Sequence, residues 1–283
     1  LNIGILTING LNCGSFLQAF ALKKRIEMEG HNVKIINTMR PRDFMKQVMF
    51  PTPLSIFETK KSFNFISEWK RQKQSIFPRK YDLVVIGSDV VWRDTKTKSS
   101  QKFFGKVNAN RIITYAPSCS ETTYEDLDNK KIKSMKNISE HSARDDKTFN
   151  LVKKVTGVTP KIVLDPTFLI DWAPYEIKSE LNNFILVYSY DRGYEDSYRR
   201  MIIQAKELSN KTGKKLVHAV EKQDWCDICI NASPFEFLGL MRNADYVITN
   251  TFHGNVFSLI YRKTFASFPT SHKVKFLLDD VEV

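Results

Sequence analysis

The stretch ADYVITNTFHGNVFSLIY, residues 244–261, combines a strand, a polar turn and an apolar helix. Residues 246–249 are a β-branched and aromatic run of strand length, and residues 256–261 are typical of a helix start. The turn between them places His253 at a helix N-terminus, where backbone N–H groups and the helix dipole attract anions. A titratable imidazole there indicates chemistry on a phosphate or carboxylate. The alternative is a histidine that caps its own helix.

The beginning of the chain has the same alternation of strand and helix. Residues 3–7 predict a first strand, and Ser15 is expected to cap a helix that runs to about Glu29. Gly30 ends this helix, and residues 33–36 predict the second strand. A β-loop-α-β start favours a parallel, doubly wound sheet.

The rest of the chain continues this alternation, with a change of domain expected in the polar segment 171–182. We therefore predict an α/β protein with two Rossmann-like lobes, residues 1–172 and 173–283, of mostly parallel sheets facing a cleft. Ligands favour the carboxyl ends of such strands. The further expected strands cover residues 83–86, 111–115, 161–164, 183–190, 215–220 and 265–268, and the further helices cover 57–74, 124–137, 145–155, 194–212 and 235–243, the last with a Ser233-Pro234 start.

The net charge of +12 comes from 43 basic and 31 acidic residues. The basic residues are spread along the chain, so many belong to solvated helix faces. A positive field would gather an anionic substrate or hold the protein peripherally at an anionic membrane surface. No nucleic-acid signature accompanies the charge, and nucleic acid is not an expected partner. Four cysteines and no apolar run of 18 residues favour the cytoplasm.

Two loops are candidates for binding a phosphate or sugar hydroxyls. The first contains Asn12, Gly14 and Ser15, whose backbone N–H groups lie near a helix start. A tight turn between strand and helix explains the same residues equally well. The second candidate, Ser88-Asp89, follows a buried strand, and its aspartate either binds acceptor hydroxyls or caps the next segment.

The remaining metal-ligand and aromatic residues form no constellation in the sequence. Cys226-x-x-Cys229 resembles half a zinc site or a redox pair, but without a second pair two unrelated thiols are favoured, and no metal is expected. The tryptophans are expected to serve packing more than sugar stacking. The histidines that we expect at the surface or at strand edges are His31, His141, His218 and His272.

Six groups of residues, spread over nearly the whole chain, resemble the polysaccharide pyruvyl transferase family. Each is modest evidence alone, but together and in this order they are strong. They are IGILT (3–7) with NCGSFLQAFAL (12–22), VIGSDVVW (85–92), SARD (142–145), VLDPTFL (163–169), FLGLMRNADYVIT (237–249) and TFHGNVFS (251–258).

The resemblance implies a GT-B-like fold and transfer of pyruvate from phosphoenolpyruvate to sugar hydroxyls as a ketal, in surface polysaccharide biosynthesis. Phosphoenolpyruvate would be the donor substrate, with no cofactor, and a glycan or lipid-linked oligosaccharide the acceptor at the inner membrane face. The N-terminal lobe would be the acceptor side and the C-terminal lobe the donor side. Members of the family usually continue beyond Val283, so part of the second lobe is expected to be missing.

The resemblance also assigns residues. The family's essential histidine falls on His253, and a donor-holding arginine on Arg144, whose alternative is a surface salt bridge with Asp145 or Asp146. We further expect the donor to be bound by Thr251, Gly254 and Asn255. Two departures concern these contacts: Thr251-Phe252-His253 stands where some members have Arg-Leu-His, and Val90 and Arg93 replace a Gln and an Asn.

Two other functions fit the same sequence. A nucleotide-sugar glycosyltransferase would share the two-lobed architecture. A non-catalytic binder of an anionic polymer would use the positive charge, and its binding would depend steeply on salt.

Overall fold

The computed structural model describes residues 1–38, 55–72, 80–93, 98–190 and 195–281. The chain divides into two compact units. Unit 1 consists of Leu1–Gly10, Ser15–Arg40 and Trp69–Ile170. Unit 2 consists of Leu11–Gly14, Pro41–Glu68 and Asp171–Val283, so a short piece of the first loop belongs to the C-terminal unit.

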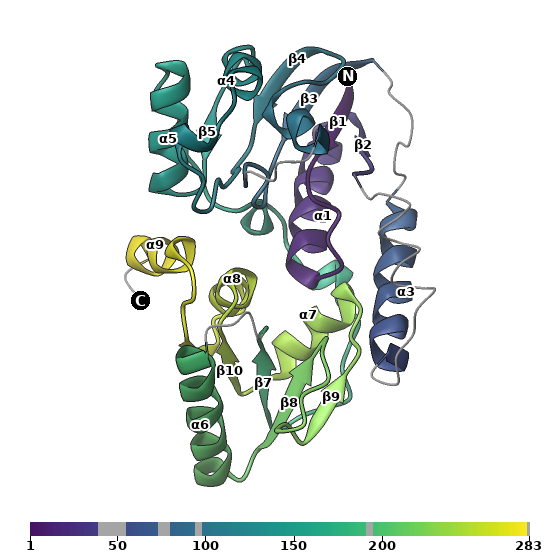
Figure 1. Cartoon of the computed structure of the whole chain (residues 1–283). Helices are drawn as coiled ribbons and strands as arrows, with labels where there is room; N and C mark the ends of the chain where they lie inside the picture. The colour runs from purple at the N-terminus through teal and green to yellow at the C-terminus, as the bar shows by residue number, and fades with distance from the viewer. Residues whose placement is uncertain (39–54, 73–79, 94–97, 191–194, 282–283) are drawn as a thin grey trace. The chain divides into compact units, whose positions relative to one another are not determined.

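Unit 1 is built on a parallel sheet with the strand order β2-β1-β3-β4 (Figure 1). From β1 the next strand is added on one side of the sheet, and from β3 it is added on the other side. The boundary between β1 and β3 is therefore the switch point, where doubly wound sheets bind ligands. A bridge between Ile113 and Glu140 leads from β4 towards a second, two-stranded parallel sheet. The strands are β1 (Asn2–Leu6), β2 (Asn32–Ile35), β3 (Tyr81–Ile86), β4 (Ala109–Thr114), β5 (Ser142–Ala143) and β6 (Lys161–Ile162).

Two helices of unit 1 begin at other residues than predicted. The first helix, α1 (Cys13–Met28), begins before Ser15, so the predicted cap is wrong. The predicted helix 124–137 is broken, because Thr123 and Asp126 close a capping box and Asp128 caps α4 (Asn129–Lys136) separately. Asp145 caps α5 (Asp146–Thr156), which corresponds to the helix predicted over 145–155. Short 3₁₀ helices cover Lys98–Phe104, Tyr124–Asp126, Pro166–Leu169 and, in unit 2, Ala173–Tyr175.

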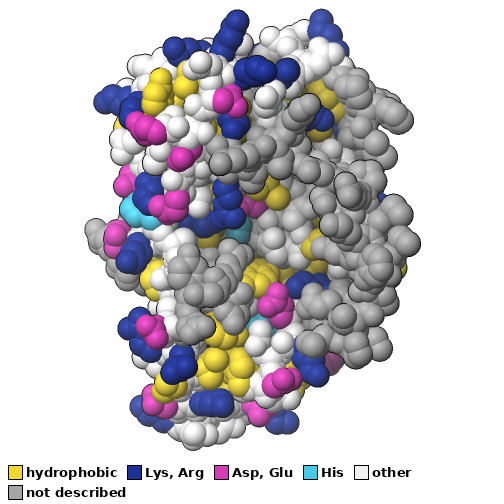
Figure 2. All heavy atoms as spheres, viewed as in Figure 1, with side chains coloured by type: hydrophobic (Ala, Val, Ile, Leu, Met, Phe, Trp, Pro, Cys, Tyr) yellow, Lys and Arg dark blue, Asp and Glu magenta, His cyan; other side chains and the backbone are white. Residues whose placement is uncertain are grey.

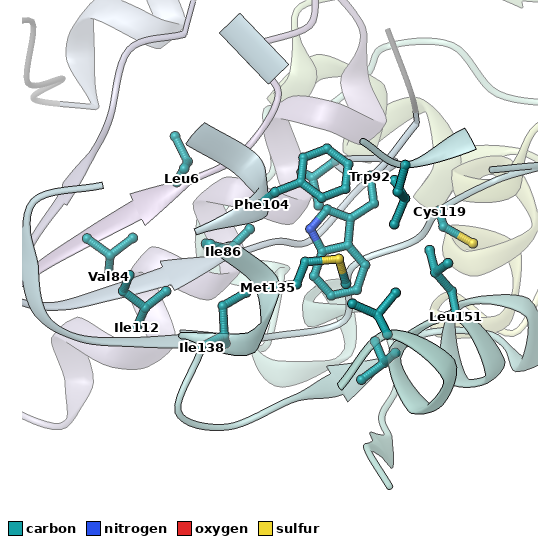
Figure 3. Packing of buried hydrophobic residues seen from close by; sticks show 14 of the residues in the cluster. Leu6, Val84, Ile86, Trp92, Phe104, Ile112, Cys119, Met135, Ile138 and Leu151 are labelled. Carbon is teal, nitrogen blue, oxygen red and sulfur yellow. The ribbon is translucent and has the colours of Figure 1, made fainter. Parts of the chain in front are cut away.

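The core of unit 1 lies between the sheet and α4–α5 (Figure 3). Trp92 is fully buried there and stacks on Phe104 with the ring centroids 6.4 Å apart. Its indole N–H donates to the Phe103 carbonyl at 2.8 Å, so the one polar atom of the side chain is satisfied. This tryptophan therefore serves packing, as expected.

Unit 2 carries a five-stranded parallel sheet with the order β11-β10-β7-β8-β9. The switch point lies between the neighbouring strands β7 and β10. The strands that follow β7 are added on one side of it, and the strand that follows β10 is added on the other side. The strand β9 was not predicted, because its apolar run of 3 residues is shorter than a typical strand. The strands are β7 (Phe184–Tyr188), β8 (Lys215–Ala219), β9 (Ile228–Ile230), β10 (Tyr246–Thr249) and β11 (Thr264–Ser267).

One helix of unit 2, α7 (Pro234–Asn243), begins at its predicted capping signal. Ser233 caps α7 in a capping box with Glu236, and Pro234 occupies the first helical position, as predicted. The helix after β10 starts four residues earlier than predicted, at Phe252. The part of α3 up to Glu68 packs with this unit. The helices are α3 (Ser55–Arg71), α6 (Glu195–Thr212), α7 (Pro234–Asn243), α8 (Phe252–Ile260) and α9 (His272–Asp280).

The described surface shows no single basic patch on the face drawn in Figure 2, where Lys and Arg side chains are interleaved with Asp and Glu. Several lysines form ion pairs with exposed glutamates, including Lys147 with Glu121 and Lys154 with Glu125. Within the described ranges, no helix is long and apolar enough to cross a membrane.

The packing of Trp92 gives a first prediction. Trp92→Ala removes a fully buried side chain and leaves a cavity, so we expect a loss of about 3–5 kcal/mol in the free energy of unfolding of unit 1. Urea unfolding followed by circular dichroism measures this loss. Trp225→Ala, at a half-buried indole of unit 2, is the matched control and should cost clearly less. Equal losses in the two variants would contradict this description of the core.

Candidate functional site

The carboxyl ends of β7 and β10 are joined by side-chain hydrogen bonds across the switch point of unit 2. Thr249 Oγ1 donates to the Tyr188 carbonyl at 2.6 Å. The Asn250 amide accepts from the Tyr190 N–H at 3.1 Å and donates to the Tyr190 carbonyl at 2.8 Å. The two loops that leave the sheet here are therefore held in one arrangement, and one of them leads directly into α8.

The turn that leads into α8 is held by hydrogen bonds between its own residues. Thr251 is the N-cap, and its Oγ1 accepts the Gly254 N–H at 2.9 Å. The Asn255 amide and backbone N–H both donate to the Thr251 carbonyl. The backbone N–H groups of Gly254 and Asn255 thus serve the cap, and donor binding by Thr251, Gly254 and Asn255 stays a prediction. Gly254 is needed for close packing, because a Cβ there would lie 2.0 Å from Thr249 Oγ1.

His253 lies in the first turn of α8, as predicted, with only 8% of the residue exposed. The helix is capped by Thr251, so the alternative of a histidine that caps its own helix is wrong. The imidazole packs directly against Gly14, where a Cβ would lie 2.1 Å from His253 Nδ1. Phe252 meets the ring at a right angle, with the centroids 5.2 Å apart. Only a glycine at position 14 leaves room for this ring.

Tyr188 holds Gly14 from the side of the sheet. Its hydroxyl accepts the Gly14 N–H and shares a hydrogen bond with the Cys13 thiol, which is fully buried. Burial raises the pKa of Cys13 and that of Tyr188 well above their ordinary values, so both groups are neutral. The hydroxyls of Tyr188 and Tyr190 lie 3.2 Å apart. The imidazole therefore lies against a segment that neutral hydrogen bonds hold in place.

His218 is a second histidine at this edge, which we expected at the surface or a strand edge. It is fully buried in β8, and its Nε2 lies 3.2 Å from Ser189 Oγ. Its Nδ1 accepts the Glu221 N–H at 3.4 Å, so Nε2 carries the proton. Desolvation lowers the pKa of His218 to about 4. The surface expectation is also wrong for His141, which is buried in unit 1.

At the switch point of unit 1, the carboxyl ends of β1 and β3 are linked through α1. Gln18 donates to Thr7 Oγ1 at 2.9 Å and accepts the Ser88 N–H at 3.2 Å. Ser15 Oγ donates to Asp89 Oδ2 at 2.6 Å, which is the contact that Ser15 makes in place of the predicted cap. Asp89 has a φ of 73°, a left-handed conformation that a non-glycine residue adopts only where its surroundings enforce it.

Arg144 is buried beside the same strand end. Its Nη1 donates to Asp165 Oδ2 at 2.7 Å and lies 3.4 Å from Ser88 Oγ. The predicted surface salt bridge is wrong, because Asp145 instead caps α5 and accepts from Ser118 at 2.7 Å. Asp165, which entered the sequence analysis only within the VLDPTFL motif, is thus the residue that orients the guanidinium.

The predicted site residues fall into two groups. Gly14 and His253 meet within unit 2, and Asn12 belongs to the same short segment of that unit. Ser15, Ser88, Asp89 and Arg144 belong to unit 1. Most of the residues that were not predicted as site residues lie at or just after the carboxyl end of a strand, and this position is the signal that could have identified them. The residues are Gln18, Asp165, Tyr188, Ser189, His218 and Asn250.

No group of three or more His, Cys, Asp or Glu side chains that could hold a metal ion occurs among the described residues. Cys226 and Cys229 are free thiols on either side of the start of β9. The Cys229 thiol donates to the Gln223 carbonyl at 3.3 Å and accepts the Gln223 N–H at 3.2 Å. These contacts shape a turn.

The two parallel sheets with their switch points define a GT-B-like α/β protein, and solved structures agree. S. aureus MnaA in complex with UDP aligns with a TM-score of 0.54 and 12% identity, covering 99% of this chain and 82% of that one. UDP-GlcNAc 2-epimerase of Methanocaldococcus jannaschii, with UDP-GlcNAc and UDP, also aligns at 0.54 and 12%, covering 100% and 87%. The predicted fold class is confirmed; at this identity the likeness concerns the fold alone.

The chain belongs to the polysaccharide pyruvyl transferase family, whose model matches residues 12–272. The match includes both Gly14 and His253, so the resemblance stated from the motifs is confirmed. No curated protein sequence matches the chain.

The contact between Gly14 and His253 gives a second prediction. Gly14→Ala places a methyl group where the imidazole lies, so the ring must move while α1, in which alanine is favourable, persists. If His253 transfers a proton, we expect turnover to fall about 10²–10⁴-fold with little loss of helix content. Steady-state kinetics and circular dichroism measure the two effects. Gly30→Ala, where the added methyl group meets no atom within 4 Å, is the control. Full activity of Gly14→Ala would contradict the role of this contact.

The burial of His218 gives a third prediction. Its folded pKa of about 4 lies below the unfolded value of 6.5, so the unfolded chain binds the extra proton between these pH values. The contribution to stability is complete above pH 6.5 and is lost as the pH falls towards 4, by about 3 kcal/mol in all. Urea unfolding between pH 7 and pH 4.5 should show a flatter dependence for His218→Asn than for the wild type. Parallel curves would contradict the neutral, buried imidazole.

Proposed function

We propose that this protein transfers pyruvate from phosphoenolpyruvate to two hydroxyls of a sugar, forming a ketal, in the synthesis of a surface polysaccharide. Membership of the family supports a transferase of this kind. The observation that carries the proposal is the position of His253, whose imidazole packs against Gly14 at the switch point of unit 2.

The reaction requires two proton movements. The two sugar hydroxyls form two C–O bonds to C2 of the donor, and the C–O bond to phosphate breaks. One hydroxyl proton ends on C3, which becomes the methyl group, and the other leaves with the phosphate. A group that both accepts and donates a proton near neutral pH serves these steps, and such catalysis contributes about 10²–10⁴ in rate.

His253 is the proposed proton-transfer group. The neighbouring Cys13 and Tyr188 stay neutral because burial raises the pKa of each, so they do not exchange protons near neutral pH. The imidazole is thus the group of this cluster suited to general acid–base catalysis. Thr251 and Asn255 contribute by fixing the first turn of α8 on which the ring is carried.

Arg144 is the proposed anion-holding residue of unit 1. Asp165 and Ser88 engage one nitrogen of its guanidinium, and a planar guanidinium suits bidentate contacts with a carboxylate or phosphate. Ser15 and Asp89 are the proposed acceptor contacts, with unit 1 as the acceptor side and unit 2, to which Asn12 belongs, as the donor side. The proposed acceptor is a glycan or lipid-linked oligosaccharide at the cytoplasmic face of the membrane, where the net charge of +12 would favour peripheral contact.

Turnover with phosphoenolpyruvate tests the proposal. The full chain is mixed with phosphoenolpyruvate and a panel of galactosides, and phosphate release is followed together with the NMR signal of the ketal methyl group. We expect both signals in the wild type, and a loss of about 10²–10⁴-fold in His253→Ala. His31→Ala, at a partly exposed histidine of unit 1, is the control and should keep full activity.

The same samples separate the rival functions. Binding of a UDP- or GDP-sugar, with none of phosphoenolpyruvate, would replace the proposal by a glycosyltransferase. Salt-dependent binding of a polyanion, with no turnover that His253→Ala can change, would replace it by a binding protein.

A further inference from the structure

Three exposed apolar side chains of unit 1 lie close together, directly after α5 and on β6. They belong to Val158, Ile162 and Leu164, which are 51%, 47% and 47% exposed. The described part of the chain exposes eight large apolar side chains in all, and three of them fall within this one short segment. Scattered exposed apolar side chains are normal on soluble proteins, whereas a group of them indicates a surface that binds something.

Exposed lysines accompany these apolar side chains. Residues 153–164 contain Lys153, Lys154 and Lys161, all exposed, and no aspartate or glutamate. The first two lysines lie in the last turn of α5, which packs beside β5 (Figure 1). The Lys153 carbonyl accepts the Gly157 N–H at 2.9 Å, so the turn that leads to the apolar residues is held at these lysines. We call residues 153–164 the 153–164 surface.

Pairing with a strand of another protein does not suit this surface. β6 is the edge of the small sheet that it forms with β5, towards which the N–H groups of Lys161 and Val163 point. Since N–H groups alternate in direction along a strand, the outer edge offers the Ile162 N–H, but Pro160 has none to offer there. A proline and a very short strand are features that protect sheet edges from such pairing.

An anionic membrane suits the surface better. Apolar side chains enter the region of the lipid headgroups without needing a hydrogen-bonding edge, and lysines around them attract lipid phosphates. The exposed face of α6 lacks this combination. It carries one exposed large apolar side chain, Ile203, and its basic residues alternate with Asp196 and Glu207.

The 153–164 surface is continuous with the candidate site of unit 1. Leu164 is followed directly by Asp165, whose buried carboxylate accepts from Arg144 Nη1 at 2.7 Å. The exposed apolar side chain and the proposed anion-holding arginine are therefore linked through a single residue. A membrane in contact with Leu164 would lie close to the strand end at which unit 1 is proposed to receive its acceptor.

We propose that the 153–164 surface docks on an anionic lipid membrane, with its three apolar side chains among the headgroups and its three lysines against the lipid phosphates. The inference deepens the proposed function, and it rests on that function for the lipid-linked acceptor, which docking would bring to unit 1. The docking itself requires neither the donor nor the reaction.

Cosedimentation of the full chain with lipid vesicles tests the proposal without phosphoenolpyruvate or an acceptor. Vesicles of phosphatidylcholine and phosphatidylglycerol in equal amounts are compared with vesicles of phosphatidylcholine alone. We expect tighter binding to the anionic vesicles. The double variant Lys153→Gln/Lys161→Gln should weaken this binding about tenfold to thirtyfold, since each lysine near a charged membrane contributes about fivefold. Raised salt should reduce the difference between this variant and the wild type.

A second double variant, Ile162→Ser/Leu164→Ser, tests the insertion of the apolar side chains. It keeps every lysine, so we expect anionic vesicles to bind about tenfold more weakly because less apolar area leaves water. The matched controls lie on α6. Lys206→Gln/Lys211→Gln removes the same charge at exposed lysines, and Ile203→Ser removes an apolar side chain that is 49% exposed. Both controls should leave vesicle binding nearly unchanged.

Three results would overturn the proposal: no binding of the wild type to anionic vesicles, equal losses in the α6 controls, or vesicle binding unchanged in both folded variants of the 153–164 surface. Self-association of the wild type that Ile162→Ser/Leu164→Ser abolishes, with vesicle binding unaffected, would assign the surface to a second copy instead. Circular dichroism checks the fold of each variant, and if the apolar variant does not fold, the lysine variant decides.

Vesicle binding and turnover separate this inference from the proposed function. Vesicle binding through the 153–164 surface, by a protein that never turns phosphoenolpyruvate over, would keep this inference and remove the proposed function. Turnover of soluble galactosides by a protein that does not bind anionic vesicles would do the reverse.

Discussion

The contact between the His253 imidazole and Gly14 is the constraint on which the rest of the site depends. It requires a residue without a Cβ at the start of α1, because any side chain there would occupy the space of the ring. It also requires that both partners be fixed. Thr251 fixes the helix turn that carries His253, and the Tyr188 hydroxyl fixes the Gly14 backbone. The position of the imidazole is thus determined by packing against Gly14.

Both units use the edge of their sheet in the same physical way. At each switch point the loops that follow two neighbouring strands leave the sheet in opposite directions. Hydrogen bonds of polar side chains connect these two strand ends. In unit 2 this is done by Thr249 and Asn250, and in unit 1 by Gln18. In unit 1 a charged group, Arg144, is added to this neutral framework, and Asp165 orients its guanidinium group.

The sequence predicted the parts of this arrangement that depend on local patterns. Runs of β-branched residues revealed β3, β7 and β10, and the Ser233-Pro234 pair revealed the start of α7. Contacts between distant residues could not be predicted in this way. The alternative role considered for Arg144 was a salt bridge with the aspartates beside it, yet its partner Asp165 lies 21 residues further on. The burial of His218 likewise depends on strands and a helix that meet only in the folded unit.

The central claim is that the ring of His253 rests on the backbone of Gly14, and a nuclear Overhauser measurement tests it most directly. In protein labelled selectively at glycine and histidine, we predict a strong cross-peak between a Gly14 α-proton and the His253 ring proton on Cε1. Gly254→Ala, which disturbs the first turn of α8, should weaken it. A wild-type spectrum in which both resonances are assigned but share no cross-peak would contradict the account.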